Sequence, residues 1–171
     1  MKKQNSNRNI KYLILHVSGN SNLNLRAQCI QDYFLRPKAQ GGKGWSRGGY
    51  HKIIEGDGDI FTFYDDNDVT FGIKPFRGIS NANSLHVCTI GGINRSGKPV
   101  DNRTEAQRKS QARVIQEYTE KYPNIKILGH NQTDLKPCPC YNVPKFLQSI
   151  GIPDKFILFD DFRGVLKANG Y

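Results

Sequence analysis

The run IKYLILHV (residues 10–17) constrains the fold of this chain most strongly, because it is mostly apolar and rich in β-forming residues. Such a run predicts a buried strand. Further strands are predicted at 84–92 (SLHVCTIGG) and 125–129 (IKILG). A hairpin is predicted at 50–64, where Gly-Asp-Gly joins two β-type runs. The fold must therefore bury several strands in one sheet.

Helical patterns alternate with these strands. Residues 23–35 have helical spacing, and four side chains can share one face: Leu25, Cys29, Ile30 and Phe34. Thr104 and Gln107 form a predicted capping box for a helix that Pro123 ends. Residues 143–151 predict a short helix with proline in its first turn. The order β-α-β-β-β-α-β-α predicts an α/β domain, with a mixed central sheet flanked by helices.

A chain of 171 residues is long enough for one globular domain with a substantial core. We expect a polar tail over 1–9, the domain over 10–151 and a C-terminal extension over 152–171. No run approaches the roughly 20 apolar residues of a membrane span. The first apolar run is also shorter than the roughly 7–15 residues of a secretory signal. We therefore expect synthesis in the cytoplasm without a signal peptide.

Basic residues exceed acidic ones by ten, and the formal net charge is +10. Such a charge attracts polyanions, whether nucleic acid, acidic lipid or an anionic cell-wall polymer, although it also aids solubility. The basic residues are spread along the chain without a block or a helical stripe, so no dedicated nucleic-acid surface is predicted. Without a signal peptide, the four cysteines favour metal binding or reduced core thiols over disulfides.

The stretch GHNQTDLKPCPC (129–140) gathers a histidine, a lysine and two cysteines in one predicted loop. Zinc prefers imidazole and thiolate ligands, and a catalytic site uses three protein ligands and leaves a position open. His16, at the end of the first strand, could supply such a set together with His130 and Cys138. Lys136 could then reach the open side. The residues alone leave open a simpler reading, with structural histidines, a solvated lysine and cysteines that only fill a turn.

Motifs in the same order over residues 10 to 150 resemble the zinc-dependent N-acetylmuramoyl-L-alanine amidases of the type 2 family. That family includes short phage amidase endolysins and the peptidoglycan recognition proteins. The family's first strand is similar to ILHVS, which places a zinc histidine at His16. Its glycine-rich segment resembles GWSRGGYHKII, which places the catalytic tyrosine at Tyr50. KILGH and LKPCP supply its remaining residues: zinc ligands His130 and Cys138, and the catalytic Lys136.

The resemblance implies a single-domain peptidoglycan amidase with one zinc ion per chain. The enzyme would hydrolyse the amide between N-acetylmuramic acid and L-alanine, and so lyse the cell wall. Zinc would activate water and polarise the carbonyl, Lys136 would stabilise the developing negative charge, and Tyr50 would orient water or relay a proton. A monomer is expected, acting on the wall after release by a holin or after delivery as an effector.

The sequence departs from the family's pattern in two places. Many members carry a Gly-x-His where this chain has Ile73 and Lys74. The segment after His130 is Asn-Gln, where an Arg-Asp or a second polar pair is common in the family. These changes leave the ligands alone and alter the expected substrate groove, so Lys74 is a candidate substrate-binding residue. Trp45 is another, as a platform for a sugar ring, although packing of its loop is an equal alternative.

Structural roles are predicted for the other histidines and cysteines. His51 should point away from the Tyr50 side, and His86 lies in a strand where the family commonly has small residues. Cys29 and Cys88 are predicted core thiols. Cys140 is predicted as a non-ligand, with ligation in place of Cys138 or a disulfide as its alternatives.

Two rival functions remain. A recognition-type module would bind peptidoglycan without cutting it, but non-catalytic relatives typically lose the zinc cysteine, which this chain has at Cys138. A basic regulator acting on nucleic acid or on a protein partner would show binding that weakens steeply with salt.

Overall fold

The computed structural model describes residues 7–171, so residues 1–6 of the predicted polar tail lie outside the described part. The strands are β1 (Tyr12–Val17), β2 (Lys52–Ile54), β3 (Ile60–Thr62), β4 (Ser84–Thr89) and β5 (Lys126–Gly129). The α-helices are α1 (Ala27–Leu35), α2 (Glu105–Lys121), α3 (Val143–Ser149) and α4 (Val165–Ala168). The predicted order of elements is confirmed as far as α3.

The five strands form one mixed sheet in the order β3-β2-β4-β1-β5. β1 pairs in parallel with both β4 and β5, and β2 pairs in parallel with β4, while β3 is antiparallel to β2. The register sets His16 opposite Cys88, and Ile14 opposite His86. Five of the six β1 residues are buried, as the apolar run predicts for a central strand. The predicted α/β fold with a mixed central sheet is therefore confirmed.

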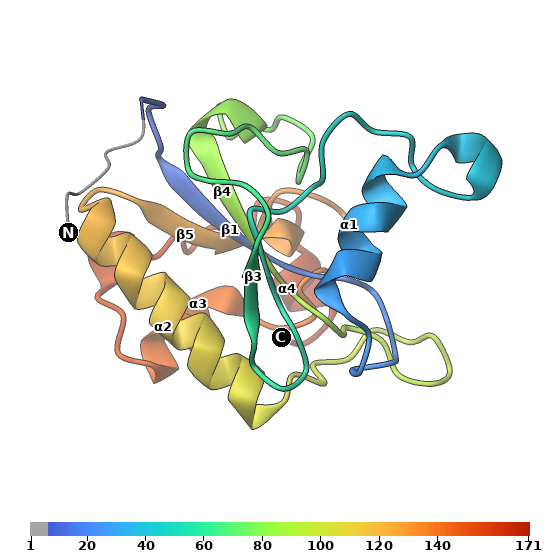
Figure 1. Ribbon diagram of the computed structural model, residues 1–171. Coiled ribbons are helices and arrows are strands. Elements are labelled where there is room, and N and C mark those ends of the chain that lie inside the picture. The colour runs from blue at the N-terminus through green and yellow to red at the C-terminus, as the bar shows by residue number, and fades with distance from the viewer. Residues whose placement is uncertain (1–6) are drawn as a thin grey trace.

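Side chains alternate between the two faces of the sheet. Leu13 and Leu15 pack into the larger core with residues of α2 and α3. Ile14 lies on the other face, in a smaller cluster with Ile73 and Ile79 of the 73–79 loop. Residues of α1 pack beside it in a third cluster. In Figure 1, α1 and α2 lie on opposite sides of the sheet. Because residue 16 follows the parity of residue 14, His16 belongs to the α1 face.

The helix starts follow local hydrogen bonding. The Thr104 hydroxyl accepts the Gln107 N–H, and the Gln107 side chain accepts the Thr104 N–H, so the predicted capping box is confirmed. α1 begins at Ala27, whose N–H donates to Glu55 Oε1 at 2.7 Å. This short helix turns Cys29 outward, so the prediction that Cys29 is a core thiol is wrong. Cys88 is buried, as predicted.

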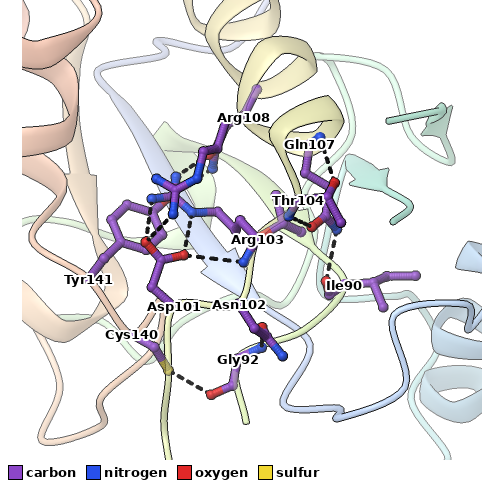
Figure 2. Close-up of polar contacts among 12 residues, drawn as sticks. Ile90, Gly92, Asp101, Asn102, Arg103, Thr104, Gln107, Arg108, Cys140 and Tyr141 are labelled. Atoms are coloured by element: carbon purple, nitrogen blue, oxygen red, sulfur yellow. Dashed lines mark hydrogen bonds and ion pairs between the residues drawn. The ribbon is translucent and has the colours of Figure 1, made fainter. Parts of the chain in front are cut away.

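A closed polar cluster joins the start of α2 to the segment around residue 141 (Figure 2). We call Asp101, Arg103, Gln111 and Tyr141 the Arg103 cluster. The Arg103 side chain, 2% exposed, donates to Asp101 through Nε at 2.8 Å and Nη2 at 2.9 Å. Its Nη1 donates to Gln111 at 2.7 Å, and the guanidinium lies 3.4 Å from the Tyr141 ring centroid. This cluster ties the segment before α2 to α2 itself and to the segment before α3.

Residues after α3 return to the core. Ile157 forms a parallel bridge with Ile127 of β5, and Ile152 and Phe156 join the larger core cluster. Among the helices of residues 7–171, none combines the length and apolar character of a membrane span.

Candidate metal centre

His16 lies at the carboxyl end of β1, with its side chain on the α1 face of the sheet. The residue is 1% exposed. Its Nε2 lies 3.0 Å from His86 Nδ1, and its Nδ1 lies 3.9 Å from Cys138 Sγ. The two ring nitrogens therefore face different partners: Nδ1 faces the loop that the sequence predicts to carry the other ligands.

His130 begins the short 3-10 turn His130–Gln132, directly after β5. Its ring centroid lies 4.9 Å from that of His16. Asn131, next to it, donates from Nδ2 to the carbonyl oxygens of Pro137 and Tyr141, at 3.2 and 3.1 Å. These bonds tie the loop that carries Cys138 to the turn that carries His130. The Asn-Gln departure from the family pattern thus has a local structural role.

Cys138 completes the group. The Val17 N–H donates to its sulfur at 3.3 Å, which brings the loop against the end of β1. His16, His130 and Cys138 each offer one ligand atom, and these atoms all lie within 4.8 Å of one another. The structure thus brings the three predicted residues together as a group that could hold a metal ion. We call it the ligand group.

Burial sets the electrostatics of the ligand group. It lowers the pKa of His16 well below 6.5 and that of His130 to about 4, so both rings are neutral and have a lone pair available. Burial raises the pKa of the Cys138 thiol to about 12. A bound cation would reverse that last effect, because metal coordination deprotonates a thiol. The ligand group therefore offers lone pairs to a cation but carries no charge of its own.

Tyr50 and Lys136, the two predicted catalytic residues, lie beside the ligand group. The Tyr50 ring centroid is 5.0 Å from that of His16, and burial raises the pKa of its hydroxyl well above 10. Lys136 has a side chain 61% exposed, and its Nζ lies 3.8 Å from Asp134 Oδ2. The same carboxylate oxygen lies 3.5 Å from His130 Nε2. Asp134 therefore links the lysine to a candidate ligand.

A cavity of about 660 Å³ opens next to these residues, and both His130 and Lys136 line it. Five aromatic side chains line it as well: Tyr33, Phe34, Trp45, Tyr50 and Phe71. Arg36 and Lys43 add positive charge, and no acidic side chain of residues 7–171 belongs to the lining. Such a surface suits an anionic ligand that also has apolar faces.

The two predicted substrate-binding residues lie in different surroundings. Trp45 lines the cavity and stacks on Phe34 with 5.1 Å between ring centroids, so it both packs the loop and faces the cavity. Lys74 is exposed and is not among the residues that line the cavity.

The remaining histidines and Cys140 are buried. His51 uses both ring nitrogens: Nδ1 accepts the His86 N–H at 3.0 Å, and Nε2 donates to the Asp68 carbonyl at 3.0 Å. Cys140 contacts the Gly92 carbonyl oxygen at 3.2 Å and lies outside the ligand group. The sequence reading missed the contact of His86 with His16. Strand alternation places residues 86 and 88 on one face, but only the pairing register brings that face to His16.

Comparisons with known proteins agree with this geometry. The family model described as N-acetylmuramoyl-L-alanine amidase matches residues 6–141. The endolysin of Enterobacteria phage K11 is 31% identical over 107 residues, which are 63% of this chain and 68% of the relative. The solved structure of the amidase LysC from Clostridium intestinale has a TM-score of 0.63 at 23% identity, over 86% of this chain and 89% of the other. Bumblebee PGRP-SA has a TM-score of 0.65 at 18% identity, over 94% and 93%. These two structures share the fold.

Proposed function

This chain belongs to the N-acetylmuramoyl-L-alanine amidase family, and on that premise we propose how its residues carry out the reaction. The activity is hydrolysis of the amide between N-acetylmuramic acid and L-alanine in peptidoglycan. In our proposal, one zinc ion per chain is held by His16, His130 and Cys138. The observation that carries the proposal is the convergence of these three side chains within 4.8 Å beside a cavity.

The donor set supports zinc in particular. Two neutral imidazoles and one thiolate are ligands that zinc prefers, and three protein ligands leave a position open for catalysis. When bound, zinc supplies Lewis-acid polarisation of the scissile carbonyl and activation of water. His16 and His130 need no deprotonation before they bind a cation, because burial keeps both rings neutral.

Lys136 would stabilise the negative charge that develops on the scissile carbonyl oxygen. Its ammonium lies at the cavity, and Asp134 holds it near His130 without closing it off from solvent. A fixed cation at this place acts more strongly on the transition state than on the neutral substrate.

Tyr50 would orient the attacking water or give a proton to the leaving amine. Burial keeps its hydroxyl protonated at neutral pH, so it can act as a hydrogen-bond donor there. Its ring packs against His16 of the ligand group, and its hydroxyl shares a hydrogen bond with the Cys88 thiol.

The aromatic and basic cavity would bind the muramyl-peptide. Trp45 would provide a flat surface for a sugar ring, and Arg36 and Lys43 would attract the peptide's carboxylates. Lys74, outside the lining, would contact only a longer stretch of the glycan or peptide. We further propose a monomer in which residues 10–151 form the amidase domain and 152–171 an extension. It would reach the wall from the cytoplasm through a holin lesion or by effector delivery.

A non-catalytic peptidoglycan-binding protein of the same fold is the alternative. The position of Cys138 within the ligand group argues for catalysis, since a binding module has no need of a third ligand beside an open cavity.

The test compares the native protein with Cys138→Ser on purified peptidoglycan, measuring bound zinc and the products together. We expect zinc and new free amino groups on L-alanine with the native protein, and neither with Cys138→Ser. Cys140→Ser is the matched control, because Cys140 is a neighbouring buried cysteine outside the ligand group, and it should keep both. Zinc without cleavage in the native protein would favour the binding module.

A further inference from the structure

We propose that His86 is a positioning residue for the metal centre, which holds His16 by accepting a hydrogen bond from its Nε2–H. The inference rests on the proposed function and adds a residue outside the ligand group. His86 is fully buried in β4, and its Nδ1 lies 3.0 Å from His16 Nε2.

The chemistry of the imidazole ring fixes the direction of this hydrogen bond. A neutral histidine carries one N–H and one lone pair. His16 Nδ1 lies 3.9 Å from Cys138 Sγ, so it is the nitrogen available to a cation in the ligand group. Its proton must then lie on Nε2, and His86 Nδ1 must accept it. A metal-binding histidine usually donates its second N–H in this way, which fixes the tautomer and the ring orientation.

His51 holds His86 in turn. The His86 backbone N–H donates to His51 Nδ1 at 3.0 Å, and the two rings stack with 5.9 Å between centroids at 19°. His51 Nδ1 also lies 3.2 Å from the Thr70 hydroxyl, and His51 Nε2 donates to the Asp68 carbonyl. All four histidines of the chain thus lie in one continuous row, from His130 at the cavity through His16 and His86 to His51.

His86 is an unfavourable residue for folding alone. Its Nε2 is buried and has no hydrogen-bond partner among the described residues. When His86 Nδ1 accepts, the proton of this ring lies on Nε2, so a buried donor is left unsatisfied, which costs stability. A leucine in the same space would avoid that cost. A leucine, however, could not accept the hydrogen bond from His16.

Gly72 makes the room for this ring. A Cβ at residue 72 would lie 2.4 Å from His86 Nδ1, and the three nearest atoms all belong to the His86 ring. The backbone of Gly72 is outside the left-handed region, so alanine is conformationally allowed there. The need for glycine comes from the space that the imidazole occupies.

The first test is a matched pair of variants, His86→Leu and His86→Asn, of similar size and shape. Asn places a side-chain oxygen near the position of Nδ1 and can accept from His16, whereas Leu cannot. We expect His86→Leu to weaken zinc binding by about tenfold to a hundredfold in competition with a chelator. His86→Asn should keep most of the affinity. Zinc-free His86→Leu should unfold at no lower urea concentration than the native protein, which a merely structural role for His86 would not allow.

The second test uses the fit between residues 72 and 86 and does not depend on His86→Leu folding. Gly72→Ala should weaken zinc binding in the native background and have no further effect in His86→Ala, where the clashing ring is gone. Equal zinc affinity of native protein, His86→Leu and Gly72→Ala would overturn the inference and leave the proposed zinc site intact. A native protein that binds no zinc would overturn the proposed function and this inference with it.

Discussion

Two buried polar groups of this protein differ in how completely their atoms are paired. In the Arg103 cluster, each guanidinium nitrogen donates a hydrogen bond, and Asp101 supplies the opposite charge (Figure 2). In the ligand group, lone pairs of two imidazoles and a sulfur converge, and burial disfavours every charged form. A polar group whose partners are all supplied by the chain serves stability. One whose lone pairs converge on a common point is suited to binding a metal ion.

The charges follow the same division. Although burial raises the pKa of Asp101, its bonds to Arg103 and the nearby Arg108 hold that pKa below the ordinary value. The carboxylate is thus charged and compensated. For Cys138, burial outweighs the Val17 N–H and the nearby Lys136, and it raises the pKa of the thiol to about 12.

The largest effect on stability should come from disrupting the Arg103 cluster. Arg103→Ala removes the buried cation from Asp101 and the donor from Gln111 Oε1, so we expect the free energy of unfolding in urea to fall by about 3–5 kcal/mol. Arg108→Ala is the matched control, because Arg108 pairs with the same Asp101 but is 42% exposed, and it should cost less than about 1 kcal/mol. Equal losses for the two variants would show that the buried Arg103 contributes no more to stability than the exposed Arg108.

Lys136→Ala tests catalysis beside the ligand group without removing a metal ligand. The catalytic rate should fall by about a hundredfold to a thousandfold, as for loss of one group that stabilises developing charge. Zinc content should not change. Lys109→Ala, a largely exposed lysine on α2, is the control and should match the native rate. An unchanged rate for Lys136→Ala would remove Lys136 from the catalytic residues.

Zinc should bind the ligand group of the folded protein and so stabilise the fold. At a free concentration about 100 times the dissociation constant, zinc should raise the free energy of unfolding by about 2.7 kcal/mol. Arg103→Ala should keep this gain, while Cys138→Ser should lose it. Stabilisation of Cys138→Ser by zinc to the native extent would place the metal elsewhere.

Acid should weaken the zinc-free protein, with a small effect from each buried histidine. Burial lowers the pKa of His51 and of His130 from 6.5 to about 4. Below pH 6.5 the unfolded chain therefore binds protons that the folded chain does not, and stability falls as the pH drops toward about 4. Between pH 6.5 and 5.5 we expect a loss of about 1 kcal/mol for each of these two histidines. The measurement is the urea midpoint across that range; a midpoint that rises in acid would contradict the assignment.

Much of the architecture could be predicted from local patterns. The apolar run of β1, the capping box at Thr104 and the Gly-Asp-Gly hairpin each depend on a few neighbouring residues, and each is where the sequence places it. The exposure of Cys29 could not be predicted in the same way. Its helix begins at Ala27 because Glu55, distant in sequence, caps it.

The ligand group could be predicted from the sequence because its motifs lie at the ends of predicted strands. The contacts around it could not be predicted. The role of His86 depends on the register that sets Ile14 opposite it, and the Arg103 cluster depends on how the α2 start meets Tyr141. Such contacts arise from tertiary packing, which no local pattern of residues specifies.

Metal analysis of the native protein, combined with the rate of L-alanine amino-group release before and after chelation, tests whether the ligand group holds a catalytic zinc ion. We expect one zinc ion per chain, loss of the activity when the ion is removed, and recovery when zinc is added back. Undiminished cleavage by a protein from which all metal has been removed would contradict it.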